Sequence, residues 1–237
     1  MSVLVVSGTG TGVGKTVVTA AVAALAAARE GSVAVVKPAQ TGVGPAQPGD
    51  LDDVRRLAGV TDLHEHGRFP DPLSPAAAAR RAGRPAVDLH ESARKVRELA
   101  SDRALVVVEG AGGLLVRYDD EGLTIADLAR EVGAAVLVVA DPALGTLNHT
   151  ALTLEAMAHR GVALAGVVLG SWPDQPDLAC RSNVRDLEML AARPLAGALR
   201  AGAGALDGAE FLLAARAGLG PGLGGAFDAA DFRRAAD

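Results

Sequence analysis

Short runs of apolar residues recur along the chain, and longer mixed segments separate them. The runs are rich in Val, Leu and Ala, which is typical of strands buried on both faces of a parallel sheet. They predict strands near residues 3–7, 33–37, 104–108, 135–140, 165–169 and 195–199. The segments between them predict helices near residues 15–29, 50–58, 74–82, 88–100, 124–132, 147–160 and 178–191.

This alternation predicts right-handed crossovers and a doubly wound, mostly parallel α/β sheet with helices on both faces. A length of 237 residues predicts a single domain, 1–237. The glycine-rich break at 218–225 precedes a last short helix, so 218–237 would be a flexible C-terminal appendage. Two irregular stretches, 41–49 and 62–75, are the kind of loop that covers a ligand at the carboxyl edge of such a sheet.

The strongest chemical signal is a glycine-rich segment between the first predicted strand and the first predicted helix. It begins at Gly8 and ends at Lys15-Thr16. Glycines let the backbone wrap a polyphosphate, Lys would reach the β- and γ-phosphates, and the Thr hydroxyl would ligate Mg²⁺. Five residues separate Gly8 from Gly14, one more than in the usual pattern. A glycine-rich turn that merely precedes Lys-Thr is the alternative, but its position between strand and helix favours a phosphate-binding loop.

Lysine is rare in this chain, which contains only Lys15, Lys37 and Lys95. Where arginine supplies most of the positive charge, a lysine suggests a need for a compact ammonium group. Lys37 ends the second predicted strand, from which it would face the phosphate loop and hold an anionic group. The alternative is a surface lysine, which is our interpretation of Lys95.

Candidate metal-binding carboxylates occur at the start of one predicted helix and at the end of one predicted strand. Asp50, Asp52 and Asp53 open a helix, where Asp50 is either an N-cap or a Mg²⁺ ligand. Spacing alone does not decide which of the three aspartates would bind the metal, although it places Asp53 on the same helix face as Asp50. Glu109 ends an apolar strand, where a second metal carboxylate is expected, since burying a carboxylate without a cation is costly.

Two further clusters are weaker signals. Residues 145–148 begin a helix whose free N–H groups would receive a carboxylate, with a plain N-cap as the alternative. His64, Glu65 and His66 lack a third metal ligand nearby and are interpreted as solvated surface.

Composition excludes several classes of function. The net charge is −5 and no basic run exceeds two residues, so nucleic-acid binding is not expected. No apolar run approaches the ~20 residues that span a bilayer, and no leader pattern precedes the first strand. The single cysteine, Cys180, suits a reducing cytoplasm, so we expect a cytoplasmic protein.

Four motifs in this order, GTGTGVGKT, KPAQTG, EGAGG and LGTLNHT, resemble those of the dethiobiotin synthetase family over about residues 1–200. The resemblance implies a P-loop NTPase-type ligase of biotin biosynthesis that forms C–N bonds. It would make the ureido ring of dethiobiotin from 7,8-diaminononanoate, CO₂ (or bicarbonate) and ATP with Mg²⁺. The intermediates would be a carbamate and a carbamic–phosphoric anhydride. A homodimer would place the active site at the subunit interface.

The resemblance also implies residue roles. The catalytic residues would be Thr11, Lys15 and Lys37. The nucleotide would contact Gly12, Val13, Gly14, Lys15, Thr16, Val17, Glu109 and Gly170. The diamine or its carbamate would contact Thr41, Gly112, Gly145, Thr146, Leu147 and Asn148, the last four from the neighbouring subunit. Mg²⁺ would be held by Thr16, Asp50 and Glu109.

Two departures from the family pattern concern the ligands. Gly10 and Gly12 replace acidic loop residues, which removes contacts to the amines of the diamine. Gly170 stands where many members carry an asparagine that reads adenine, so we hypothesise relaxed base selectivity with tolerance of CTP or other triphosphates.

Two other classes remain as alternatives. A related amidoligase would usually carry a glutaminase cysteine, whereas Cys180 lies on a predicted helix. A nucleotide-switch ATPase would carry an extra lysine early in the loop, which here begins Ser7-Gly8-Thr9.

Overall fold

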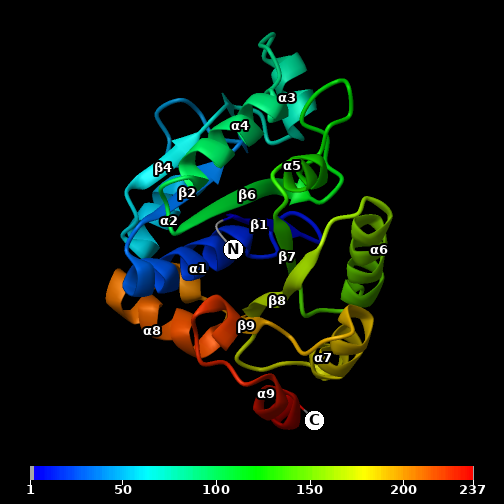
Figure 1. The fold of residues 1–237 in the computed structure, drawn as a ribbon. Helices are drawn as coiled ribbons and strands as arrows, with labels where there is room; N and C mark the ends of the chain where they lie inside the picture. Colours follow the sequence, from blue (N-terminus) through cyan, green and yellow to red (C-terminus); the bar gives the residue numbers. More distant parts are fainter. Residues whose placement is uncertain (1–2, 237) are drawn as a thin grey trace.

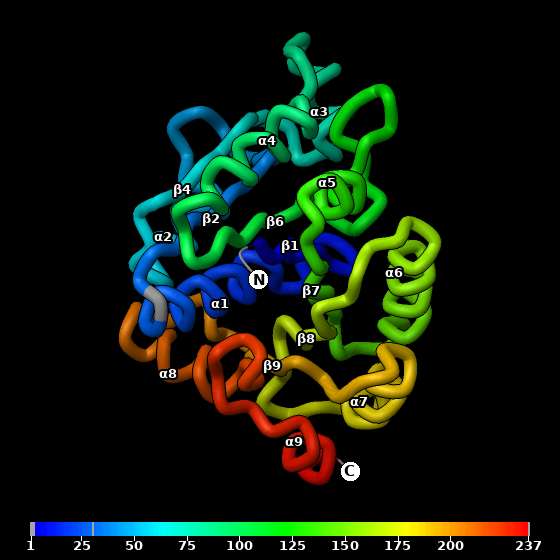
Figure 2. The backbone as a smooth tube through the Cα atoms, viewed as in Figure 1, coloured from blue at the N-terminus to red at the C-terminus, as the bar shows by residue number. Residues whose placement is uncertain are grey.

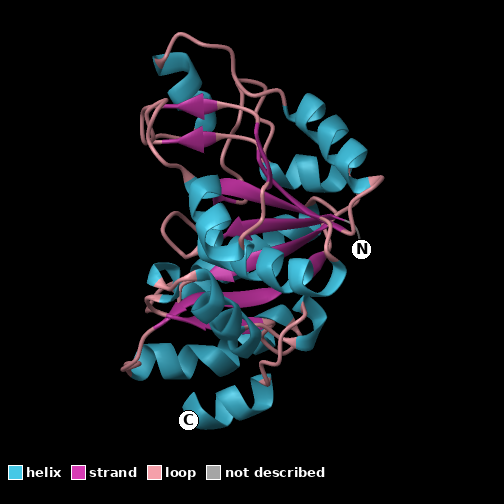
Figure 3. Cartoon of the chain, turned by 90° about the vertical axis from the view of Figure 1, so that its left-hand side faces the viewer, coloured by secondary structure: helices cyan, strands magenta, loops and turns pink. Residues whose placement is uncertain are grey.

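The computed structural model describes residues 3–236, which fold around a seven-stranded sheet (Figure 1). All its ladders are parallel, and the strand arrows point the same way (Figure 3). The order across the sheet is β4 (Asp62–Glu65), β2 (Val33–Lys37), β6 (Leu105–Gly113), β1 (Val3–Gly8), β7 (Ala135–Ala140), β8 (Leu164–Trp172), β9 (Gly197–Arg200). The predicted parallel α/β fold is confirmed.

Helices cover both faces of this sheet. One face packs against α1 (Lys15–Glu30), α2 (Asp50–Ala58) and α8 (Gly208–Gly218). The other packs against α3 (Pro75–Arg81), α4 (Leu89–Ala100), α5 (Ile125–Glu131), α6 (Thr146–His159) and α7 (Leu178–Ala191). No helix within residues 3–236 is long and apolar enough to cross a membrane.

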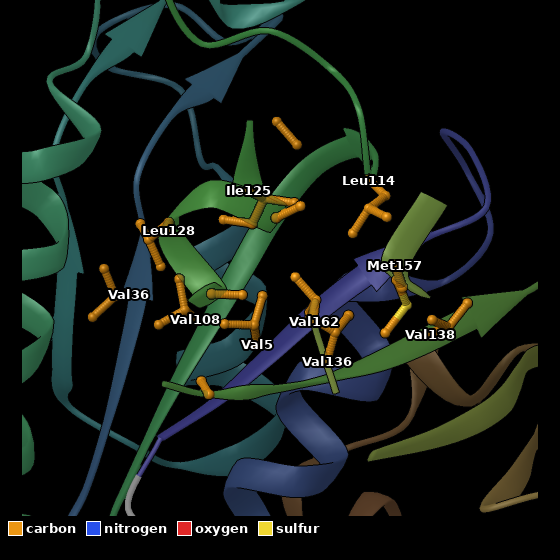
Figure 4. Packing of buried hydrophobic residues seen from close by; sticks show 14 of the residues in the cluster. Val5, Val36, Val108, Leu114, Ile125, Leu128, Val136, Val138, Met157 and Val162 are labelled. Atoms are coloured by element: carbon orange, nitrogen blue, oxygen red, sulfur yellow. The ribbon is translucent and has the colours of Figure 1, made fainter. Parts of the chain in front are cut away.

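Alternation along the strands divides the core in two. On β1, Val5 joins the cluster under α4 and α5, whereas Val6 joins the cluster under α1 and α8. Figure 4 shows the first cluster, in which Ile125 and Leu128 of α5 lie over Val5 and Val108. Because both faces are covered, the strands are apolar at nearly every position, which is why the sequence reveals them.

Three short strands and one α-helix were not predicted from the sequence. The stretch 62–75, predicted as a loop, contains β4 and also β5 (Arg68–Phe69), which pairs in parallel with β3 (Gln40–Thr41). The apolar pattern misses β4 because this edge strand has half-exposed side chains, with Leu63 as its one aliphatic residue. Helix α8 was also not predicted, although the Asp207 side chain caps it by accepting two backbone N–H groups.

The C-terminal segment lies against α7 and the sheet edge (Figure 2). Residues 218–225, where a flexible break was expected, contain a 3₁₀ turn (Pro221–Leu223), and Leu219 bridges Gly197 of β9. Helix α9 (Ala229–Ala236) follows. Its Phe232 ring packs edge-on to Trp172 with centroids 4.9 Å apart, and Arg233 forms an ion pair with Glu188 of α7.

Candidate active site

The segment between β1 and α1 forms a tight loop at the N-terminus of α1. Gly12 and Gly14 have φ angles of 79° and 94°, a left-handed conformation that side chains rarely adopt. Gly8 is so close to the loop that a Cβ on it would lie 2.7 Å from Val13 and 2.8 Å from the Gly10 carbonyl. The N-cap residue of α1 is Gly14, which has no side chain to cap the helix, so the first-turn N–H groups are available to an anion.

Lys15 folds back across this loop. Its Nζ donates a hydrogen bond to the Gly10 carbonyl at 2.8 Å, and its side chain is buried. Burial, followed by repulsion from the Lys37 ammonium, holds the pKa of Lys15 below its usual range. Because its charge is only partly compensated, an anion placed beside it would be stabilised.

Gly170, at the end of β8, backs the phosphate loop. A Cβ on Gly170 would lie 1.9 Å from the Val13 carbonyl oxygen, and one on Gly14 would lie 2.7 Å from the Gly170 carbonyl oxygen. The two backbones therefore pack directly on each other, which excludes a side chain at position 170.

A buried cation and two carboxylates meet beside the loop. The Nζ of Lys37 lies 2.7 Å from Oε1 of Glu109 and 2.6 Å from Oδ2 of Asp50, and it donates to the Gly110 carbonyl at 3.2 Å. The Thr16 hydroxyl donates to the same Glu109 oxygen at 2.9 Å. Residues from β2, β6, α1 and α2 therefore converge on one point.

Strand register explains this meeting. Val36 of β2 is paired with Val108 of β6, so Lys37 and Glu109 follow side by side at the strand ends. Val36 and Val108 both point into the core under α4 and α5. Because side chains alternate along a strand, the next residues point to the opposite face, toward α1 and α2.

The charges around this point balance each other in part. Burial alone would lower the pKa of Lys37, but Glu109 and Asp50 outweigh it and hold that pKa above its usual range. Burial alone would raise the pKa of Asp50, but the Lys37 ammonium outweighs it, so this carboxyl stays ionised at neutral pH. Oε2 of Glu109 is buried and has no hydrogen-bond partner among residues 3–236, so it retains capacity for a further cation.

The donor set suits Mg²⁺. Two carboxylates and one hydroxyl, from Asp50, Glu109 and Thr16, resemble the few oxygen ligands that hold this ion together with substrate phosphates. The unpartnered Glu109 oxygen supports this fit.

One cavity of about 600 Å³ opens onto these groups. The predicted site residues that line it are Thr11, Gly12, Gly14, Lys15, Thr16, Val17, Lys37, Thr41, Asp50, Glu109 and Gly112. Val13 instead packs into the core, and Gly170 lies behind the loop. The start of α6, residues 145–148, is also outside the lining.

Sequence reasoning missed other lining residues. They are Ala39, Gln40, Pro72, Leu73, Ser74, Pro75, Ala111 and Val116. Gln40 lies inside the KPAQTG motif, and residues 72–75 belong to the proline-rich stretch predicted to cover a ligand. The sequence therefore indicated these segments, but it did not indicate which of their residues line the cavity.

The structure separates the three acids at the start of α2. Asp50 lines the cavity and contacts Lys37. Asp52 accepts the Gly49 N–H at 2.8 Å in a capping box, and the exposed Asp53 pairs with Arg56. Asp53 therefore points to solvent, although helical spacing placed it with Asp50.

The start of α6 is an exposed helix N-terminus. Gly145 caps it with a φ of 97°, and Asn148 is exposed. Thr146 is buried, and its hydroxyl has no hydrogen-bond partner within the part of the chain that the structure describes. Leu144, just before the helix, is 88% exposed.

The His64-Glu65-His66 triplet is not the solvated surface that the sequence suggested. Its side chains are partly buried and bonded: His66 Nδ1 lies 2.8 Å from the Ser92 hydroxyl, and Glu65 forms a two-point ion pair with Arg68. The triplet spans the end of β4, which brings these side chains against α4 and β5.

Comparisons with known proteins identify relatives over nearly the whole chain. A family model described as an AAA domain matches residues 2–201. An ATP-dependent dethiobiotin synthetase of Frankia casuarinae is 67% identical over 98% of this chain and 98% of its own length. One of Streptomyces avermitilis is 56% identical over 99% of both chains. The match thus extends past residue 200, where the motif resemblance ended.

Solved structures show the fold alone. A ParA family ATPase from Chlorobium tepidum has a TM-score of 0.53 at 15% identity, covering 90% of each chain. The MinD cell division ATPase of Pyrococcus furiosus has a TM-score of 0.52 at 17% identity, covering 84% of each chain. At these identities the likeness extends to architecture only. Together with the curated relatives, the site geometry leads to one conclusion: this chain belongs to the ATP-dependent dethiobiotin synthetase family.

Proposed function

We propose that this chain closes the ureido ring of dethiobiotin from 7,8-diaminononanoate and CO₂ with a nucleoside triphosphate, a C–N bond-forming step of biotin biosynthesis. The observation that carries the proposal is the convergence of Lys15, Lys37 and the Asp50–Glu109 pair on one cavity beside the phosphate loop. A site that joins a triphosphate to an anionic substrate needs fixed positive charge at this position.

The reaction needs positioning more than covalent chemistry by the protein. An amine of the substrate and CO₂ give a carbamate, whose oxygen attacks the γ-phosphorus and releases the nucleoside diphosphate. The resulting carbamic–phosphoric anhydride is attacked by the second amine, which closes the ring and expels phosphate. Negative charge accumulates between nucleotide and substrate at each step, and Lys15 and Lys37 lie where they would stabilise it.

Thr16, Asp50 and Glu109 would hold Mg²⁺ against the triphosphate. The bound ion would add positive charge beside the β- and γ-phosphates. Thr11, Thr41 and Gly112 line the same cavity and would contact the diamine or its carbamate.

Base selectivity is proposed to be relaxed. The backbone contact between Gly170 and Val13 leaves no room for a side chain that would read the base from this position. We therefore expect CTP and other triphosphates to be accepted in place of ATP. Turnover measured with each at limiting concentration tests this, and a strong preference for ATP would contradict it.

We further propose a homodimer in which residues 145–148 of the partner subunit receive the substrate carboxylate. Free helix N–H groups suit a carboxylate, and Leu144 and Leu152 beside them are 88% and 57% exposed. Sedimentation of the wild type and of Leu152→Glu tests this arrangement. A wild-type monomer with full activity would contradict it.

We assign residues 1–237 to one domain, with 218–237 as its appendage, and the protein to the cytoplasm.

Phosphate release from ATP tests the reaction itself. It should require both the diamine and bicarbonate, and mass spectrometry should detect dethiobiotin. ATP hydrolysis that ignores both substrates but responds to DNA, lipid or a partner protein would instead indicate a nucleotide switch.

A further inference from the structure

Arg68 on β5 makes four hydrogen bonds, to one carboxylate and two backbone carbonyls, although it is outside the cavity. Its Nε and Nη2 donate to the Glu65 carboxylate at 2.7 and 2.9 Å. Its Nη1 donates to the carbonyls of Gly44 and Gln47 at 3.2 and 2.6 Å. The guanidinium thus joins β4 to the irregular segment 41–49, which has no regular structure after Thr41.

This segment connects two cavity residues. Thr41 is its first residue and Asp50 directly follows it, and both line the cavity. Gln40, paired with Arg68 in the β3–β5 ladder, accepts the Asp50 N–H at 2.9 Å with its side-chain oxygen. A Cβ on Gly49 would lie 2.9 Å from both Arg68 Nη2 and the Gln40 side-chain oxygen, so these side chains enclose the residue before Asp50.

We infer that Arg68 is a positioning residue for ring closure. It acts by holding segment 41–49, so that Asp50 stays against Lys37 and Thr41 stays in the cavity. The inference rests on the proposed roles of Asp50 and Thr41. The geometry requires an arginine, because only a planar guanidinium can grip a carboxylate with two N–H groups and still donate to two carbonyls.

The phosphate loop does not depend on the hydrogen bonds of Arg68. Lys15 bonds to Gly10, and Gly170 backs the loop from β8, so neither contact involves Arg68. Loss of the Arg68 hydrogen bonds should therefore weaken the binding of Mg²⁺ and of the diamine. The affinity for ATP without metal should not change. A purely structural role would instead weaken all three together.

The test compares Arg68→Lys with Arg97→Lys, a control at an exposed arginine that pairs with Glu131. Losing these charge-assisted bonds should raise the Mg²⁺ concentration for half-maximal activity and the KM for the diamine about tenfold. The Kd of ATP in EDTA should stay within about twofold. Amide hydrogen exchange should accelerate in residues 41–50 and not in the phosphate loop. Glu65→Gln, a milder change, should shift the same constants in the same direction.

Opposite results would overturn the inference. These are unchanged Mg²⁺ and diamine constants in Arg68→Lys, or an equal loss of ATP affinity in EDTA. If Arg68→Lys fails to fold, Glu65→Gln decides by the same measurements. A wild-type chain that binds Mg²⁺-ATP but makes no dethiobiotin would contradict the proposed function. Hydrogen exchange and the Mg²⁺ dependence of ATP affinity would then still test Arg68.

Discussion

Lys37 and Glu109 form a buried ion pair in which one carboxylate oxygen serves two donors. Oε1 of Glu109 accepts from Nζ of Lys37 at 2.7 Å and from the Thr16 hydroxyl at 2.9 Å. The two charged side chains are only 3% and 1% exposed, so each depends on the other for solvation. The pair links the sheet to the first turn of α1, where the phosphate loop ends.

Replacing Lys37 should separate binding from chemistry. In Lys37→Ala we expect kcat to fall at least about 100-fold, because the cation beside the transferring phosphoryl group is lost. The Kd of the triphosphate should change little, since Lys15 and the loop remain. Steady-state kinetics and calorimetry measure the two quantities. Lys95→Ala, at an exposed lysine, is the control, and unchanged turnover in Lys37→Ala would remove Lys37 from the mechanism.

The contact behind the phosphate loop should not tolerate a methyl group. In Gly170→Ala the new Cβ would lie 1.9 Å from the Val13 carbonyl oxygen, so the loop must move. We expect triphosphate affinity to fall about tenfold or more, with a loss of stability of about 1–3 kcal/mol. Gly222→Ala is the matched control, because a Cβ there meets no atom within 4 Å. Equal affinities in both variants would count against the contact.

Tyr118 should stabilise the glycine-rich end of β6. Its hydroxyl accepts the Ala111 N–H at 2.8 Å, and burial raises the pKa of Tyr118 to about 12, so the phenol is neutral. Tyr118→Phe leaves the buried N–H unpaired and should cost about 1–3 kcal/mol in urea unfolding. Gly112, which follows Ala111, lines the cavity, so the KM for the diamine should also rise. An unfolding curve that matches the wild type would contradict this.

His66 should make the protein less stable in mild acid. Burial, then the nearby Lys95 and His64, lowers the pKa of His66 from 6.5 to about 4. The folded chain thus keeps His66 neutral where the unfolded chain protonates it. Its stabilising contribution is complete above pH 6.5 and is lost as pH falls toward 4.

The expected loss is about 2 kcal/mol, reduced from the full shift because the ring is partly solvated. Urea unfolding between pH 7 and 4 measures it against His66→Gln, whose stability should fall less over this range. Parallel curves for the two proteins would exclude His66 as the cause.

The fold could be predicted to the extent that burial leaves a local pattern. Strands β1, β2 and β7 are covered on both faces, and their apolar runs reveal them. Strand β4 is at the sheet edge, half exposed, and looks like a loop. Helix α8 was missed although its Asp207 cap is visible in the sequence.

The candidate site divides in the same way. The phosphate loop is contiguous, so its glycines and Lys15 could be assigned from spacing. A metal-binding role for Glu109 was expected from its position at the end of an apolar strand. The choice of Asp50 came from the family resemblance, because spacing alone left three aspartates open. Arg68 gave no signal, because its importance depends on the carbonyls of Gly44 and Gln47 more than twenty residues earlier.

By itself, the sequence determined the features that depend on neighbouring residues: the turn of the glycine loop, the alternation of strands and helices, and the residues at the strand ends. Only the tertiary structure decided which of those ends meet. Strand order placed β2 beside β6, and their register brought Lys37 and Glu109 onto one face. The physical reason is that local backbone preference acts over a few residues, whereas an ion pair between residues 72 positions apart exists only once the sheet has assembled.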